Sequence, residues 1–307
     1  MTGKQPVDLA ASVHRRLLNI SLATGDSFNL LLSRYAIERL LSRLSLSPYA
    51  NQFVLKGALL FLVWQMPDHR PTRDLDLLGY GDDSAERLRA VFRALCALDV
   101  EPDGITFLPD SIEVRQIREE QEYGGQRITV MAMLGRAKIP VRVDVGFGDA
   151  VLPPAVEAEY PTLLSFPSPR LRVYSRETVI SEKLHAMITL DLTNSRMKDF
   201  YDLWILSRRF EYDGRTLVSA IKATFDRRQT ELLIDAPIAL TNAFGSNADK
   251  VTQWRAFIRR NGLDVNELRL DQIVEQLAGF LEPPRLAAAS GLPFDAQWPA
   301  AGPWLAD

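Results

Sequence analysis

The stretch RPTRDLDLLGYG, residues 70–81, places two aspartates one residue apart within a run of leucines. Successive side chains of a strand point to opposite faces, so Asp74 and Asp76 would share one face while Leu75 and Leu77 share the other. The leucines can then be buried while the two carboxylates lie roughly 6–7 Å apart at the backbone. Like charges at that separation are unfavourable unless a metal ion, an arginine or water neutralises them.

Further strands are predicted on both sides of this one. FVLK precedes a turn at Gly57, and residues 104–147 contain three β-branched segments separated by turn residues. In the clearest, KIPVRVDVGFG, apolar residues alternate with Arg142, Asp144 and Gly146. This alternation predicts a strand with one apolar face and with Asp144 on the other.

The second half of the chain has a different character. The segment LPPAVEAEYPTLLSFPSPRL contains five prolines and predicts a connector, after which helical periods dominate. We therefore predict an α+β protein whose mixed sheet is followed by a helical C-terminal domain. Its expected parts are a sheet domain with N-terminal helices over residues 1–150, a helical domain over 151–282 and an irregular tail over 283–307.

Composition excludes several classes of protein. The single cysteine rules out an intramolecular disulfide and a cysteine zinc cluster. No run approaches the roughly 18 apolar residues of a membrane span, and no signal peptide is visible. We expect a cytoplasmic protein with no membrane partner, and the net charge of −3 argues neither for nor against nucleic acid.

Three carboxylates on predicted strands, Asp74, Asp76 and Asp144, could hold metal ions. Mg²⁺ prefers carboxylates, water and substrate phosphates, and two-metal sites need several anionic oxygens. The alternative is a solvated strand face on which Arg70 or Arg73 pairs with the aspartates.

Two lysines could serve phosphate chemistry. Lys56 and Gly57 fall at a strand-to-helix turn, where glycine permits close approach of a phosphate and lysine adds a point charge. Lys183 lies in an apolar helix and needs a partner such as Asp199. The alternatives are a surface lysine beside a structural glycine, and a salt bridge between two helices.

The order of these motifs resembles the AbiEii/AbiGii toxins, nucleotidyltransferase-like toxins of bacterial toxin–antitoxin and abortive-infection systems to which the mycobacterial MenT toxins are related. The resemblance runs from RYAIERLLSRLSLSPYANQFVLKGALLFLVW through RPTRDLDLLGYG, VRVDVGFGD and ISEKLHAM to NSRMKDFYDLW, over about residues 11–260. It implies a DNA-polymerase-β-like nucleotidyltransferase core and a helical C-terminal domain.

The resemblance also implies roles for individual residues. The family's metal-binding pair matches Asp74 and Asp76, and the lysine of its KG motif matches Lys56. The lysine of its helical motif matches Lys183, and the aspartate of the following motif matches Asp199. The predicted catalytic residues are thus the two strand aspartates with Lys183 and Asp199.

Other predicted site residues match the wider superfamily by position only. Asp144 falls where a third metal-binding carboxylate is usual. The Gly-Ser that usually precedes the paired aspartates is replaced by KGALL, and Thr72 lies two residues before Asp74. Thr72 and Arg73 join Lys56 and Gly57 as the predicted nucleotide-binding residues.

The implied reaction transfers a nucleoside monophosphate from an NTP to the 3′ end of tRNA, which blocks translation. The implied cofactor is Mg²⁺ or Mn²⁺, and the implied partners are NTP, the tRNA acceptor end and a cognate antitoxin encoded nearby. Two alternatives share these residues: a nucleotidyltransferase that modifies proteins, and an NTP-binding defence effector without transfer activity.

Overall fold

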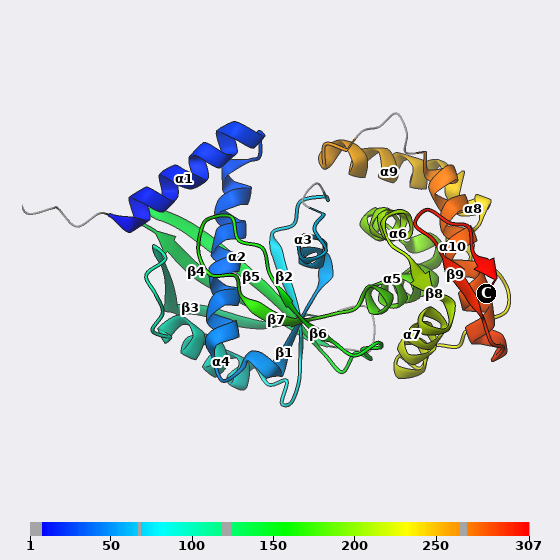
Figure 1. Ribbon diagram of the computed structural model, residues 1–307, viewed down its shortest axis with the longest axis horizontal. Coiled ribbons are helices and arrows are strands. Elements are labelled where there is room, and N and C mark those ends of the chain that lie inside the picture. The colour runs from blue at the N-terminus through cyan, green and yellow to red at the C-terminus, as the bar shows by residue number, and fades with distance from the viewer. Residues whose placement is uncertain (1–7, 67–68, 118–123, 264–268, 307) are drawn as a thin grey trace, which may run out of the picture. The chain divides into compact units, whose positions relative to one another are not determined.

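The computed structural model describes residues 8–66, 69–117, 124–263 and 269–306 (Figure 1). The chain divides into two compact units. The first comprises Met1–Gly148 and Val156–Tyr174, and the second comprises Asp149–Ala155 and Ser175–Asp307. Within the described ranges, no helix combines the length and the apolar character needed to cross a membrane.

The first unit is built on a seven-stranded mixed sheet in the order β3-β4-β5-β2-β1-β7-β6 (Figure 1). Strand β2 runs parallel to β5, and β1 runs parallel to β7, while the other neighbours are antiparallel. The strands are β1 Phe53–Lys56, β2 Asp74–Gly79, β3 Ile105–Ile117, β4 Gly125–Leu134, β5 Ala137–Phe147, β6 Val156–Glu159 and β7 Arg170–Val173. The helices are α1 Leu9–Thr24, α2 Phe28–Leu46, α3 Leu60–Val63 and α4 Ala85–Ala97, with 3₁₀ turns at Ala50–Gln52 and Gly57–Leu59.

The predicted alternation of β2 is confirmed. Leu75 and Leu77 are buried, whereas Asp74 and Asp76 are half-buried. Helices α2 and α4 pack on the sheet, where α2 contacts β5 and α4 contacts β3 (Figure 1). Apolar burial of this kind is the main force that holds helix to sheet.

Buried charges in α2 fix the position of this helix. Glu38 is fully buried, and its carboxylate accepts hydrogen bonds from Arg39 (2.7 Å) and from the backbone N–H of Leu163 (2.7 Å). Arg43 donates 2.7 Å and 3.3 Å hydrogen bonds to the carboxylate of Asp103. Buried ionisable groups require such partners, so these contacts specify how α2 lies against the rest of the unit.

The second unit is mainly helical. Strands β8, β9 and β10 form a small sheet in the order β10-β9-β8. The elements are α5 Arg176–Leu190, α6 Met197–Arg209, β8 Tyr212–Asp213, α7 Gly214–Arg227, α8 Asn242–Gly245, α9 Ala248–Arg260, α10 Leu270–Ser290, β9 Ala296–Trp298 and β10 Leu305–Ala306, with 3₁₀ turns at Asp191–Thr193 and Ile238–Leu240. The predicted class, a mixed sheet with helices followed by a helical part, is confirmed.

The predicted proline-rich connector is wrong in part, because it contains two strands of the first unit. β6 and β7 complete the edge of the sheet beside β1. Both strands are only four residues long, and β6 is largely exposed. A short edge strand such as β6 lacks the apolar alternation by which strands are recognised in a sequence, which explains the error. Residues 156–174 thus belong to the first unit and not to the helical domain.

The predicted irregular tail over residues 283–307 is wrong in part, because α10 continues through Pro283 and Pro284 to Ser290. A proline lacks the N–H that would bond the carbonyl four residues earlier. In this helix the carbonyl of Phe280 instead accepts a 2.9 Å hydrogen bond from Trp304 Nε1. The helix therefore persists because a side chain of the following segment replaces a lost backbone donor.

Glu38 should make the stability of the protein depend on pH. Burial raises the pKa of Glu38 from 4.5 to about 7, although Arg39 and the Leu163 N–H act in the opposite direction. Between these two values the native state binds more protons than the unfolded chain, so stability falls as the pH rises. Relative to Glu38→Gln, the wild type should lose on the order of 3 kcal/mol between pH 4.5 and pH 7.

Urea denaturation of both proteins at several pH values measures this difference. The glutamine variant keeps a hydrogen-bond acceptor for Arg39 but cannot ionise, so it is the matched reference. If the difference in unfolding free energy between the wild type and Glu38→Gln stays constant across this pH range, the pKa of Glu38 is not raised by burial.

Candidate functional site

Strand register brings four charged residues into one row across the sheet of the first unit. Lys56 of β1 lies opposite Asp76 of β2, which lies opposite Asp144 of β5. Asp144 in turn lies opposite Arg127 of β4. Residues directly opposite each other in paired strands share a face, so these four side chains project from the same side.

Asp74 lies on the same face, one step outside this row. It is opposite Arg142 of β5, whose Nη1 is 3.3 Å from Asp74 Oδ1, and both side chains are about half exposed. The hydroxyl of Thr72 accepts a 3.4 Å hydrogen bond from the Asp74 N–H. Thr72 thereby supports the start of β2, and the neighbouring Arg73 is exposed.

Gly57 permits a close approach that another residue would block. It follows β1 with a φ of +74°, and a Cβ atom built on it would lie 2.0 Å from Asp76 Oδ2. The turn backbone therefore packs directly against the Asp76 carboxylate. Beside it, Lys56 Nζ lies 5.5 Å from the centre of the Tyr174 ring, in a cation–π contact.

Asp144 has a specific partner that sequence reasoning missed. Arg127 Nε and Nη2 donate hydrogen bonds of 2.7 Å each to the two carboxylate oxygens of Asp144. Hydrogen bonding to Asp144, together with the negative charges of Asp144, Asp74 and Asp76, raises the pKa of Arg127, although burial acts in the opposite direction. The alternation of QRITVMAML places Arg127 on the polar face of its strand, but the strand register is needed to reveal its partner.

The arrangement of carboxylates suits a magnesium ion that is held by two aspartates, and it does not form a complete metal site of three protein carboxylates. In the part of the chain that the structure describes, no three His, Cys, Asp or Glu side chains are grouped so as to hold a metal. Mg²⁺ commonly takes one or two carboxylates and completes its shell with water and substrate phosphate. Asp74 and Asp76 can supply such a pair, whereas both oxygens of Asp144 are bonded to Arg127 in this conformation.

The predicted partner of Lys183 is confirmed in the second unit. Lys183 Nζ of α5 lies 2.6 Å from Asp199 Oδ1 and 2.8 Å from Asp202 Oδ2, both on α6. Arg196 Nε lies 2.7 Å from the other oxygen of Asp199. The two aspartates are fully buried, so this cluster joins the two helices, as the salt-bridge alternative predicted.

The charge of Asp199 is stabilised by these cations. Burial alone would raise its pKa, but Lys183 and Arg196 outweigh burial and hold the pKa below its usual value. The carboxylate is therefore ionised at neutral pH and depends on its two partners. The catalytic roles of Lys183 and Asp199 stay predictions.

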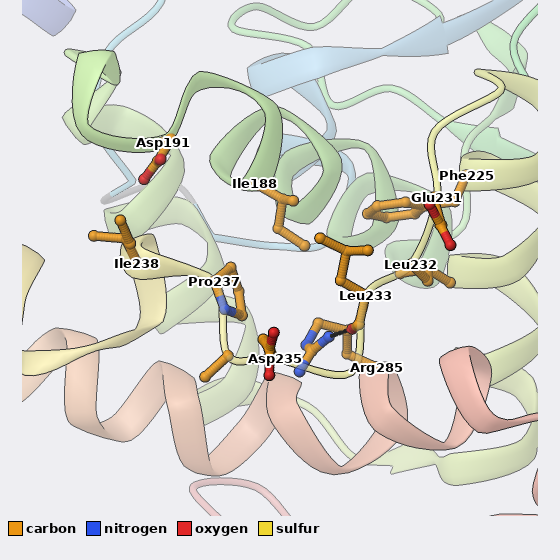
Figure 2. Close-up of a pocket in the computed structure, with 11 residues that line it drawn as sticks. Ile188, Asp191, Phe225, Glu231, Leu232, Leu233, Asp235, Pro237, Ile238 and Arg285 are labelled. Carbon is orange, nitrogen blue, oxygen red and sulfur yellow. Dashed lines mark hydrogen bonds between the residues drawn. The ribbon is translucent and has the colours of Figure 1, made fainter.

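A cavity of about 220 Å³ lies in the second unit, between the end of α5, the loop over residues 231–238 and α10 (Figure 2). Ile188 and Leu233 point toward each other across it, and Arg285 lies at its edge (Figure 2). Arg285 is buried and donates a 2.7 Å hydrogen bond to Glu282. None of the predicted site residues lines this cavity, and the guanidinium of Arg285 is already paired with Glu282.

Comparisons with known proteins found a family model and solved structures that resemble this chain. The family model described as nucleotidyl transferase AbiEii toxin, type IV TA system, matches residues 39–276. A crystal structure of JHP933 from Helicobacter pylori is 16% identical, with a TM-score of 0.49, and the match covers 87% of this chain and 94% of that one. A candidate nucleotidyltransferase from H. pylori is 15% identical, with a TM-score of 0.48 and coverage of 87% and 97%. No curated protein was found to match the chain.

The family match spans well over half of the chain and defines a nucleotidyltransferase of the toxin class. The chain belongs to the AbiEii family of type IV toxin–antitoxin systems, as its motif order predicted.

The contact between Gly57 and Asp76 should make Gly57→Ala more costly than an ordinary glycine substitution. Alanine at a positive φ costs about 1 kcal/mol, and the clash with the Asp76 carboxylate should bring the total to about 3 kcal/mol. Gly25→Ala is the matched control, because Gly25 has a φ of +78° and nothing within 4 Å of a built Cβ. Equal losses in urea denaturation would show that the turn does not constrain Asp76.

Lys183→Met should destabilise the protein by about 3–5 kcal/mol, because it leaves two buried aspartates without their shared cation. Lys222→Met, which removes an exposed lysine from α7, should change stability by no more than about 0.5 kcal/mol. Thermal and urea unfolding measure both. A folded, fully stable Lys183→Met protein would remove the structural explanation and leave the predicted catalytic role.

Proposed function

We propose that this toxin uses a divalent metal ion to transfer a nucleoside monophosphate from an NTP to the 3′ end of tRNA, which blocks aminoacylation and translation. The observation that supports it best is the row formed by Lys56, Asp76 and Asp144 on one face of the sheet. In this row a lysine that could bind phosphate lies beside two carboxylates, with Asp74 one step away.

Asp74 and Asp76 would hold Mg²⁺ or Mn²⁺. Bound there, the metal would neutralise the triphosphate and align it with the attacking hydroxyl. Lys56 would offset the charge that develops on the leaving phosphates, since a positioned cation acts most strongly where charge appears in the transition state. Gly57 leaves room for the Asp76 carboxylate beside the turn, and its lack of a side chain would let a phosphate approach the backbone.

Asp144 would accept the proton of the attacking 3′-hydroxyl or help to bind a second metal. In the first role, the hydroxyl oxygen forms a bond to the α-phosphorus while its proton passes to the carboxylate. The bond from that phosphorus to the bridging oxygen breaks, and pyrophosphate leaves. The half-buried position of Asp144 beside Asp76 supports both roles.

The remaining predicted residues have supporting parts in this proposal. Thr72 would orient the start of β2 through its hydrogen bond to the Asp74 backbone, and Arg73 is exposed where it could contact nucleotide. Lys183 would offset phosphate charge, and Asp199 would orient it through their 2.6 Å hydrogen bond.

The motif resemblance implies the proposed acceptor, and the family match supports the proposed partner. Transfer to tRNA places the toxin in the cytoplasm, where tRNA and NTPs occur together. The type IV toxin–antitoxin assignment supports a cognate antitoxin encoded nearby. A tRNA acceptor end offers the free 3′-hydroxyl that the proposed chemistry requires.

The proposal is tested by incubating the protein with Mg²⁺, total tRNA and each α-labelled NTP in turn, followed by a denaturing gel. The wild type should lengthen and label tRNA with at least one NTP. Asp74→Ala should lower the rate at least about a hundredfold, since the metal supplies several kcal/mol of transition-state stabilisation. EDTA should abolish labelling.

Glu113→Gln is the matched control. Glu113 lies on β3 and pairs with Arg115 at 2.7 Å, so the substitution removes a carboxylate from the same sheet outside the charge row. It should keep full activity. Label in a protein band would show that the acceptor is a protein and not tRNA. Tight NTP binding without pyrophosphate release would show that the protein binds NTP without transferring a nucleotide.

A further inference from the structure

Arg127 lies at the end of the charge row, and its position has chemical consequences. Its side chain is 41% exposed and that of Asp144 is 21% exposed, so their bidentate contact borders solvent. The pair can therefore exchange partners more readily than the fully buried ion pairs of this protein. A guanidinium fork also fits a phosphate group as well as it fits a carboxylate.

Arg127 and a cation at Asp144 exclude each other. Arg127 occupies both oxygens of Asp144 with 2.7 Å hydrogen bonds, so a metal ion can bind this carboxylate only after Arg127 has left. Once released, Arg127 can bind another anion, because it has lost its ion-pair partner Asp144 and the bound cation would neutralise the surrounding aspartates.

The site itself would supply that anion. The strands β4 and β2 are two positions apart in the sheet, roughly 10 Å between their backbones. Arg127 already extends along this direction to reach Asp144 on the strand between them. A polyphosphate held beside Asp76 would lie within the range of the same side chain.

We propose that Arg127 changes partner during the reaction: it holds Asp144 in the nucleotide-free protein and binds the triphosphate of the loaded protein. This inference rests on the nucleotidyl transfer proposed above. Arg127 is then a positioning residue for Asp144 before nucleotide binds, and a phosphate ligand afterwards. It couples access to the third carboxylate to the arrival of the substrate.

The exchange predicts effects of opposite sign on two ligands. Without nucleotide, Arg127→Gln should bind Mn²⁺ about tenfold more tightly, because the competing guanidinium is gone. With saturating Mn²⁺, it should bind inorganic tripolyphosphate about tenfold more weakly, because a charge-assisted bidentate contact is lost. Electron paramagnetic resonance of unbound Mn²⁺ and isothermal titration calorimetry measure the two affinities without relying on activity.

Three variants serve as controls. Arg115 lies opposite Arg127 in the β3–β4 pairing, one strand further from Asp144, and pairs with Glu113. Arg115→Gln therefore removes the same charge without removing a partner of Asp144, and it should change neither affinity more than about twofold. Arg127→Lys keeps the charge without the fork and should fall between the wild type and Arg127→Gln. Asp144→Asn in the Arg127→Gln background should lose the gain in Mn²⁺ affinity.

Each other result overturns the partner exchange. If Arg127→Gln binds Mn²⁺ no more tightly than Arg115→Gln, Arg127 does not compete with metal. If it gains Mn²⁺ affinity but keeps tripolyphosphate affinity, Arg127 only shields Asp144. In both cases Mn²⁺ binding that is lost in Asp74→Ala would leave the proposed function standing. If Asp74→Ala does not alter Mn²⁺ binding, both the partner exchange and the proposed function are wrong.

Discussion

The parallel pairing of β2 with β5 is the constraint on which the site depends. It places Asp76 and Asp144 side by side, an arrangement that repulsion between like charges disfavours. The outer strands relieve it, since β1 brings Lys56 against Asp76 and β4 brings Arg127 against Asp144. In the row, two anions therefore lie between two cations. The strand pairing that forms the sheet also determines the order of the charges on its polar face.

The second unit solves the same problem differently. Lys183 lies between Asp199 and Asp202, and all three charges are largely removed from water. Breaking one of these ion pairs would leave an uncompensated charge in the interior, so the cluster holds the two helices together. On the sheet, the side chains of Asp144 and Asp74 are instead 21% and 46% exposed, so solvent can reach them. Burial rather than charge therefore decides how readily each group of charges can change partners.

The sequence predicts what depends on local periodicity. Alternation around Asp74 and Asp144 identified two strands and their polar faces, and the apolar surroundings of Lys183 indicated that it needs a partner. Arg127 escaped because its importance comes from the β4–β5 register, a long-range property that no local pattern contains. The extent of α10 escaped for a similar reason, since Trp304 satisfies a carbonyl that the prolines leave without a backbone donor.

Gly57 shows how local and long-range constraints meet in the site. Its positive φ ends β1, while its missing side chain leaves room for the carboxylate of Asp76 on the neighbouring strand. Antiparallel pairing of Lys56 with Asp76 fixes the height at which the chain turns. The turn and the carboxylate must therefore be adjacent in any sequence that keeps this pairing. Asp74 lies beyond the last paired residue of β1, and its side chain is more exposed to solvent than that of Asp144.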